Sequence, residues 1–383
     1  MSSVGASAPD VVVIGAGVVG AACADALAAG GLRVLVLDAG FTGGGTTGAG
    51  MGHLTVMDDS PAQLALSAWS VARWTELAAE MSPACEDVPT GTLWLASNAG
   101  ELAAAREKGE TFARAGVASE LLDARALASI EPALCAGLSG ALRVPGDRVL
   151  YPPAAARWLL GRMEARGGRV RERCQVLSIR AGEVTVRCDA GGSERISCGS
   201  VVNAAGIEAP ELTPGLMVVP RKGHLVITTR RAPVIRHQLV ELGYLTSAHT
   251  MNASSTAFNL QPRATGQLLI GSSRELVGRD ASVNRKVLGE MVARAVHFVP
   301  SLGDMTALRI WTGFRPATPD KLPLIGAWPA VPGLWIAAGH EGLGITTAPG
   351  TAAIIAAGIL GQRSPIDPAP FAPNRAMPTA VAA

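Results

Sequence analysis

The hydrophobic positions near the start of the chain predict a strand, a helix and a second strand. An apolar run covers residues 11–14, small residues fill 16–30, and a second apolar run over 32–37 ends at Asp38. Three glycines, Gly15, Gly17 and Gly20, stand where the first strand passes into the helix. This order of elements is typical of a strand–turn–helix–strand unit at the edge of a parallel sheet.

Each part of this unit has a physical role in binding a dinucleotide. Gly15 permits a tight turn, Gly17 lets the backbone approach a pyrophosphate, and Gly20 lets the helix lie close to the strand. The helix N-terminus offers N–H groups and a positive dipole end to the phosphates. Asp38, eighteen residues after Gly20, can accept hydrogen bonds from a ribose hydroxyl. The alternative is a glycine-rich turn that binds nothing.

The pattern along the rest of the chain predicts further elements. Helices are expected over residues 61–80, 100–131, 151–166 and 283–298, and strands over 92–96, 169–176, 184–188, 196–203 and 334–338. Short alternating segments over 217–272 predict an antiparallel sheet with one solvated face. The five prolines of 365–383 predict an extended or disordered tail.

These elements predict an α/β fold in two lobes. A discontinuous nucleotide-binding lobe is expected over 10–82, 145–216 and 310–362, and a mixed α+β substrate lobe over 83–144 and 217–309. The strand that ends at Asn203 runs into Ala205 and Gly206, a small-residue turn that offers a further dinucleotide contact.

The composition of the chain excludes some classes of function. The 383 residues are 48% hydrophobic and 17% charged. The net charge of +2 is too small to favour binding to nucleic acid or to an anionic membrane. No apolar run is long enough to span a bilayer, and residues 1–9 are too short for a secretory signal, so we expect a cytoplasmic protein. The six cysteines have no metal-site spacing and are expected to be reduced and mostly buried.

With these pieces in place, the chain resembles the FAD-dependent D-amino-acid oxidase superfamily, which includes glycine oxidase and sarcosine oxidase. The resemblance covers about residues 10–362 and depends on segments 13–20 with Asp38, 311–326 and 339–347. It implies an FAD-binding Rossmann-like lobe of the GR2 type with an inserted substrate lobe. The finer pattern of 48–54, 221–227, 261–273 and 339–344 looks most like the flavin subunit of bacterial D-hydroxyproline dehydrogenases, which is related to hydrogen cyanide synthase flavin subunits.

The resemblance assigns residues to the cofactor. The implied FAD-binding residues are Gly15, Ala16, Gly17, Val18, Val19, Asp38, Ala39, Thr46, Thr47, Met51, Gly52, His53, Val176, Ala205, Gly206, His340, Glu341, Gly342, Leu343, Gly344, Ile345 and Thr346. Some relatives attach FAD through a cysteine near the position of Gly313. Because no cysteine follows Cys198, we expect non-covalent FAD. No metal is expected.

The resemblance also places Arg315 where the superfamily binds the substrate carboxylate. A guanidinium can hold a carboxylate with two parallel hydrogen bonds; a structural arginine is the alternative. Tyr244 is a candidate pocket wall and His53 a candidate beside the flavin ring, although ordinary packing and a solvated loop are the respective alternatives. His340, His224 and His249 are weaker candidates. Gly342 stands where glycine oxidase-like members often have a second arginine, which favours a bulkier substrate.

The implied reaction is oxidation of a D-amino or cyclic imino acid, with D-hydroxyproline or D-proline as the first candidate, by hydride transfer to flavin N5. Electrons would pass to partner subunits or another acceptor. The alternative is a glycine, sarcosine or D-amino-acid oxidase that uses oxygen directly. A third reading is an FAD-bearing subunit kept for assembly.

Overall fold

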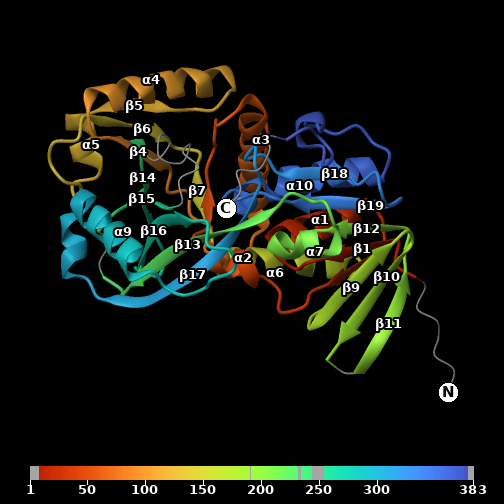
Figure 1. The fold of residues 1–383 in the computed structure, drawn as a ribbon. Coiled ribbons are helices and arrows are strands. Elements are labelled where there is room, and N and C mark those ends of the chain that lie inside the picture. The colour runs from red at the N-terminus through yellow and green to blue at the C-terminus, as the bar shows by residue number, and fades with distance from the viewer. Residues whose placement is uncertain (1–7, 190, 232–233, 244–253, 378–383) are drawn as a thin grey trace. The chain divides into compact units, whose positions relative to one another are not determined.

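The computed structural model describes residues 8–189, 191–231, 234–243 and 254–377, drawn in Figure 1. The chain divides into two compact units. Unit 1 comprises residues 1–48, 152–219 and 315–382, and unit 2 comprises 49–151 and 220–314. Residues 49–82 and 145–151 therefore belong to unit 2 by their contacts, whereas the sequence pattern assigned them to the nucleotide lobe.

Unit 1 is built on a six-stranded sheet with the order β18-β19-β12-β1-β2-β8. β1 pairs in parallel with β2 and with β12, and β12 pairs in parallel with β19. The central strands are short runs of consecutive apolar residues, without polar alternation, because both faces of this sheet are covered. The strands are β1 (Val11–Ile14), β2 (Val34–Leu37), β8 (Arg169–Arg171), β12 (Ser200–Asn203), β18 (Leu324–Ala327) and β19 (Leu334–Ala338).

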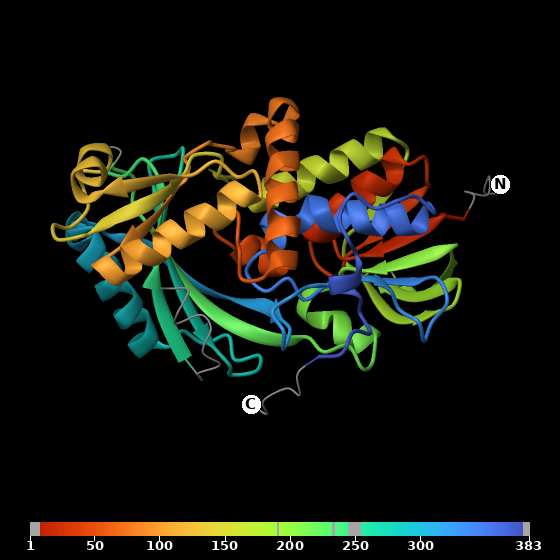
Figure 2. The ribbon, with the colours of Figure 1, turned by 90° about the horizontal axis from the view of Figure 1, so that it is seen from above.

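Helices and a small sheet complete unit 1. α1 (Val18–Ala29) contacts both α6 (Pro152–Ala165) and α10 (Gly344–Ile359); the blue α10 beside the red α1 is seen in Figure 2. Alternate side chains of β1, Val12 and Ile14, pack instead with the antiparallel sheet of β9 (Cys174–Arg180), β10 (Glu183–Cys188) and β11 (Gly191–Ser197). The short α7 (Ala209–Leu212) follows β12.

Unit 2 contains an eight-stranded mixed sheet with the order β17-β13-β16-β15-β14-β4-β6-β5. Most neighbours are antiparallel, but β14 pairs in parallel with β4. The strands are β4 (Thr92–Ala96), β5 (Glu120–Asp123), β6 (Gly140–Val144), β13 (Val219–Thr228), β14 (Gln238–Glu241), β15 (Ser254–Pro262), β16 (Leu268–Glu275) and β17 (Ala307–Ala317), whose last residues reach unit 1. β3 (His53–Leu54) and β7 (Arg148–Val149) form a separate pair.

One face of the unit 2 sheet forms an apolar core with α9 (Arg285–Phe298) and α5 (Ala124–Ile130). The helix expected over 283–298 begins at Arg285, and its stripe of Val287, Met291, Ala295 and Phe298 is buried, whereas Val283 precedes the helix and is exposed. Phe298 stacks on Phe258 of β15 at 4.5 Å between ring centroids. α2 (Gly45–Ala49), α3 (Pro61–Leu77) and α4 (Ala99–Arg114) are the other helices. No helix in the described ranges is long and apolar enough to cross a membrane.

The structure corrects several expectations. Cys174 and Cys188 form a disulfide, because the β9–β10 hairpin places them directly opposite each other. The expected tail is ordered over 363–377: Phe371 is buried, and Arg375 pairs with Asp320. The single strand expected over 169–176 is two strands in different sheets, and β5 interrupts the helices expected over 100–131.

Candidate functional site

The glycine turn of unit 1 has the close contacts that its sequence predicted. Gly15 has a φ of +105°, and a Cβ there would lie 2.5 Å from the carbonyl oxygen of Ala204. A Cβ on Gly20 would lie 1.9 Å from the carbonyl oxygen of Gly15, so only glycine lets α1 lie this close to β1. Gly15 N–H donates to the carbonyl of Leu37 at 2.8 Å, which joins the turn to β2.

The N-terminus of α1 is held by a residue far along the chain. The N-cap Gly17 has no side chain, and the N–H of Val18 donates to Oγ1 of Thr47, a buried residue of α2, at 3.1 Å. A Cβ on Gly17 would lie 3.1 Å from the same oxygen. Thr47 therefore fixes the helix entry, and the glycine leaves its backbone open to close approach. Thr46 precedes it in α2, Ala16 is buried, and Val19 follows in the first turn.

Asp38 closes the turn from the end of β2. Its Oδ2 accepts the N–H of Ala16 at 2.6 Å and its Oδ1 accepts the N–H of Gly40 at 2.7 Å. Each carboxylate oxygen has a second lone pair, so these bonds leave capacity for a ribose hydroxyl. Asp38 is thus a positioning residue for the glycine turn as well as the predicted ribose acceptor. Ala39 beside it is exposed.

A second turn leaves the neighbouring strand β12 at the same sheet edge. Ala204 N–H donates to the carbonyl of Ile14 at 2.9 Å. The buried Asn203 accepts the N–H of Ala205 at 3.2 Å and donates to Oγ1 of Thr213 at 2.9 Å. Gly206 follows with a φ of +60° and open space beside it. Asn203 anchors this turn, a role that its position at the end of an apolar strand did not reveal.

Val176 lies in β9, buried and opposite Val186 of β10. Its side chain belongs to the apolar cluster under the end of β2. The pairing with β10 therefore holds the backbone of Val176 in a fixed register.

The segment 339–346 forms a turn that enters α10. Glu341 has a φ of +46°, and its N–H donates to the carbonyl of Pro316 at 2.8 Å. A Cβ on Gly344 would lie 3.6 Å from Cγ2 of Val19, so the first turns of α10 and α1 are adjacent. Leu343 is the N-cap and Ile345 and the buried Thr346 follow. Two helix N-termini therefore face one region of unit 1.

His340 is buried at the start of this segment. Its Nε2 lies 2.9 Å from Oγ1 of Thr351, one of the buried residues of α10. Burial lowers the pKa of His340 to about 3, so the imidazole is neutral at physiological pH. This contact gives His340 a structural role in fixing the turn.

Arg315 lies at the end of β17, where the strand enters unit 1. Its Nε and Cδ are 3.5 and 3.6 Å from the position that a Cβ on Gly342 would occupy. The guanidinium stem therefore runs along a turn residue that has no side chain. The carbonyl of Pro316 in β17 accepts the hydrogen bond from the N–H of Glu341. The strand and the turn 339–346 therefore fix each other's position.

Unit 2 contains the other predicted cofactor residues. Gly52 has a φ of +111°, and its carbonyl accepts the N–H of Leu150 at 2.9 Å. His53 is half-buried in β3, and burial lowers its pKa to about 3. The Met51 Sδ lies 2.9 Å from where a Cβ on Gly271 would be. Tyr244 and His249 lie outside the described residues.

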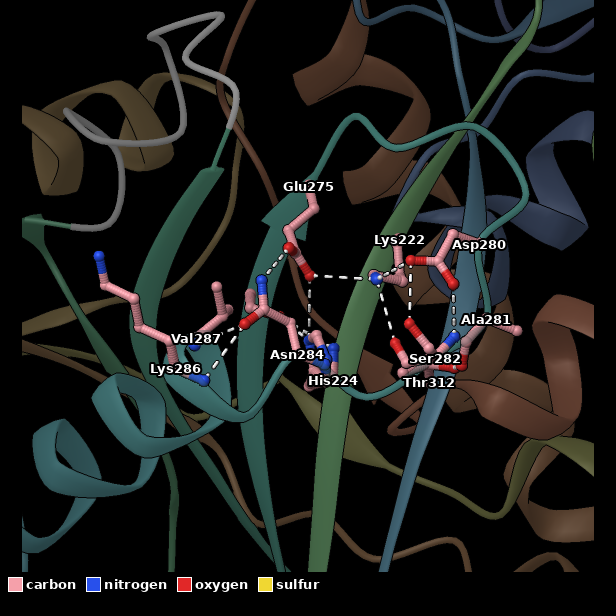
Figure 3. A network of polar contacts seen from close by, with 11 residues as sticks. Lys222, His224, Glu275, Asp280, Ala281, Ser282, Asn284, Lys286, Val287 and Thr312 are labelled. Carbon is pink, nitrogen blue, oxygen red and sulfur yellow. Dashed lines mark hydrogen bonds and ion pairs between the residues drawn. The ribbon is translucent and has the colours of Figure 1, made fainter.

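His224 belongs to a buried network at the start of α9 (Figure 3). Its Nε2 accepts the N–H of Asn284 at 3.0 Å, and its Nδ1 lies 2.9 Å from Oγ of Ser273. The Asn284 side chain caps α9 and donates to Glu275 at 2.8 Å, while Lys222 Nζ donates to the carbonyl of Ser282 at 3.1 Å. This network supports the helix terminus.

The residues of unit 1 fit FAD. Gly17 at the N-cap of α1 has no Cβ, and one there would lie 3.1 Å from Oγ1 of Thr47. The α1 N-terminus and Asp38 stand where such a fold binds the pyrophosphate and the ribose. The chemistry of this donor set is that of a dinucleotide cradle.

Comparison with known proteins agrees with this geometry. The FAD-dependent oxidoreductase family, DAO, matches residues 10–357. The chain is 30% identical over 376 residues to a glycine oxidase of Pseudomonas aeruginosa, covering 95% of this chain and 98% of the relative. It is 32% identical over 308 residues to a D-amino acid dehydrogenase of Xylella fastidiosa, covering 76% and 66%. The crystal structure of glycine oxidase from Geobacillus kaustophilus superposes with a TM-score of 0.85 at 27% identity, covering 97% of this chain and 99% of that one. The chain therefore belongs to the family of FAD-dependent oxidoreductases.

Proposed function

We propose that this protein oxidises an amino or imino acid at the carbon that bears its nitrogen, and that Arg315 holds the substrate carboxylate. The observation that carries the proposal is the Arg315 side chain beside Gly342. Gly342 adds no side chain beside Arg315 Nε and Cδ, and a planar guanidinium matches the geometry of a carboxylate. The two helix N-termini near Val19 and Gly344 add positive partial charge in unit 1.

The cofactor, Arg315 and the substrate amine supply different parts of the reaction. When bound, FAD supplies the acceptor for the hydride that the substrate loses. Arg315 orients the substrate through two parallel hydrogen bonds. The substrate amine in its neutral form supplies the electron push, so the mechanism needs no strong base from the protein. Burial lowers the pKa of His340 to about 3, so this imidazole stays neutral and does not repel a cationic product.

Among substrates, we propose a D-amino or cyclic imino acid, with D-hydroxyproline or D-proline first. Gly342 supports a cyclic substrate, because a larger side chain at this position would fill the space beside Arg315. The relationship to a D-amino acid dehydrogenase supports transfer of electrons to an acceptor other than oxygen, including redox partner subunits. We further propose non-covalent FAD, because Gly313 has no space for any side chain: a Cβ there would lie 2.4 Å from Cβ of Ala49.

A second candidate function is that of a glycine, sarcosine or D-amino-acid oxidase that reacts directly with oxygen. The observation in its favour is the 30% identity to a glycine oxidase over nearly the whole chain. Oxygen uptake by the isolated protein with substrate separates the two functions, since a dehydrogenase reduces an artificial dye without producing peroxide.

The experiment that tests the proposal is anaerobic bleaching of the flavin by cis- and trans-4-hydroxy-D-proline, D-proline, sarcosine, glycine and D-alanine. Bleaching by the cyclic acids supports the substrate proposal, whereas bleaching by glycine or sarcosine alone refutes it.

Replacing Arg315 with Met is expected to weaken substrate binding by about 3 kcal/mol, or roughly a hundredfold. Arg315→Lys is the matched control: it keeps the charge but not the two-pronged geometry, and is expected to be intermediate. Wild-type affinity in Arg315→Met would show that the carboxylate is held elsewhere.

A further inference from the structure

The segment that follows α10 packs along β18, the edge strand of the unit 1 sheet. A short helix in it, η5 (Ala369–Phe371), contacts β18, and Phe371 is buried. Gly326 of β18 has a φ of +143°, and a Cβ there would lie 3.2 Å from Cδ of Pro373. The missing side chain at Gly326 therefore lets the segment lie close to the strand. We call residues 366–377 the C-terminal segment.

Arg375 joins the C-terminal segment to the turn between β17 and β18. Its Nε and Nη2 donate to the two carboxylate oxygens of Asp320 at 2.6 and 2.8 Å. Its other N–H groups donate to main-chain carbonyls, those of Leu322 at 2.7 Å, Pro323 at 3.0 Å and Ala372 at 3.2 Å. All five N–H groups of the guanidinium are thus used, and this side chain is only 11% exposed.

The turn 318–323 contains a backbone conformation that is unfavourable by itself. Lys321 has a φ of +65°, in the left-handed region that residues with a Cβ rarely adopt. Its N–H donates to the carbonyl of Thr318 at 3.2 Å, and Thr318 Oγ1 donates to the carbonyl of Leu322 at 2.8 Å. Such a conformation persists where the surrounding structure holds it, and the guanidinium of Arg375 binds this turn at a carboxylate and two carbonyls.

The same turn adjoins the residues that are predicted to face the flavin and the substrate. Its first residue, Thr318, comes three residues after Arg315. Thr318 Cγ2 lies 2.6 Å from the position that a Cβ on Gly339 would occupy, and Leu324, directly after the turn, pairs with Ala338 of β19. All of these residues belong to unit 1. A shift of the turn would therefore move both the end of β17 and the entry to α10.

We propose that Arg375 is a positioning residue: it fixes the turn 318–323, and through it the placement of Arg315 and of the entry to α10. This inference rests on the proposed function. A planar guanidinium can hold a carboxylate and two carbonyls at once, whereas the ammonium group of a lysine is a point charge without this fork. The alternative is an ion pair that only anchors the C-terminal segment, which would affect stability alone.

The test uses variants of the holoenzyme. Arg375→Met removes every bond of the guanidinium, and Arg375→Lys keeps a charge beside Asp320 without the fork. The double variant Asp320→Asn/Arg375→Met removes the pair without leaving an uncompensated carboxylate, in case Arg375→Met does not fold. Arg33→Met is the matched control. Arg33 also pairs with an aspartate of unit 1, Asp10, but at the start of β1 and β2, the end of these strands opposite the glycine turn.

Two quantities are measured below the melting temperature of each variant. One is the limiting rate of anaerobic flavin reduction by the acid that bleaches the wild-type flavin fastest, and the other is the FAD dissociation constant from equilibrium dialysis. We expect Arg375→Met to lower the rate about tenfold and to weaken FAD binding about threefold. Arg375→Lys should recover the melting temperature but not the rate. Arg33→Met should change neither quantity by more than about twofold.

A loss in either quantity that Arg33→Met does not show supports the inference. Values within about twofold of wild type in the folded Met variants overturn it, and assign Arg375 to stability alone. A wild-type rate in Arg375→Lys also overturns it, since charge without the fork would then suffice, and this variant decides if neither Met variant folds. If no amino or imino acid bleaches the wild-type flavin, the proposed function fails, while the FAD dissociation constants still test the role of Arg375 toward the cofactor.

Discussion

Asp147 provides a test of the electrostatics of unit 2. Its side chain is fully buried in the turn between β6 and β7. Burial raises its pKa from 3.8 to about 7, against the opposing effects of hydrogen bonds from Thr92 and from the backbone of Val56 and of the charge on Lys108. The N–H of Val56 donates to Oδ1 at 3.2 Å. The folded protein therefore holds this proton more tightly than the unfolded chain does.

The sign of the pH effect follows from this difference. Between pH values of about 3.8 and 7 the folded state binds more protons at this site, so its contribution to stability is present below pH 3.8 and is lost as the pH rises through about 7. The difference in pKa corresponds to roughly 4 kcal/mol. Asp147→Asn removes the titration and keeps the acceptor for Val56. The variant should therefore gain stability over wild type as the pH rises.

The assay is urea unfolding of wild type and Asp147→Asn at pH 5, 6, 7 and 8, followed by the fluorescence of tryptophans that include the buried Trp74 and Trp94 of unit 2. We expect the stability difference to grow by a few kcal/mol across this series. Asp320→Asn is the control of opposite sign: burial alone would raise the pKa of Asp320, but hydrogen bonds and charge from Arg375 outweigh it and lower that pKa, so this variant should lose stability at pH 8. A pH-independent difference for Asp147→Asn would refute the reasoning.

Three further predictions concern the glycines and the disulfide. Gly342→Arg places a second cation beside Arg315 and should lower the affinity for cyclic acids relative to glycine at least about tenfold, measured by flavin bleaching; an unchanged ratio would contradict the pocket argument. Gly17→Ala crowds Thr47 and should weaken FAD binding about tenfold, as measured by equilibrium dialysis. Gly161→Ala is the control, because Gly161 faces open space on α6; this variant should stabilise the folded protein by about 0.5–1 kcal/mol and leave the FAD affinity unchanged. The cross-link between Cys174 and Cys188, separated by 14 residues, should contribute about 3 kcal/mol, so Cys174→Ser should lower stability and make it insensitive to reductant; equal wild-type stability with and without dithiothreitol would show that the thiols are not bonded.

Local sequence patterns predicted the elements that have clear hydrophobic and turn signals in their own residues. The strands at 92–96 and 334–338 have the predicted bounds, and the turn at Gly15 has the predicted constraints. These segments are short apolar runs bounded by polar or glycine positions, so burial and turn chemistry agree. The dinucleotide-binding turn was also predicted from sequence, because glycine spacing reports a backbone requirement directly, whereas the FAD-binding fold was implied by the family resemblance.

Non-local pairing was not visible in the same way. β17, over Ala307–Ala317, contains arginine, tryptophan and threonine at half-exposed positions and shows no clean alternation. It is a strand because β13, more than eighty residues earlier, lies beside it. The Cys174–Cys188 bond likewise depends on the register of β9 against β10, which spacing alone does not specify.

The polar alternation of residues 217–272 was misjudged for an instructive reason. Alternation predicts one apolar and one polar face, and a polar face is usually solvated. Here Gln238 and Gln261 are nearly inaccessible. The residue type at these positions indicates burial, because a solvated strand face generally contains charged residues, whereas Gln238 and Gln261 are uncharged amides.

An uncharged polar face can be buried at moderate cost if each amide finds a partner, whereas a charged one requires an opposite charge. This difference explains how unit 2 can enclose Gln238, Asn259 and Gln261 without ion pairs, while Lys222 and Glu275 elsewhere in the same sheet lie 3.6 Å apart.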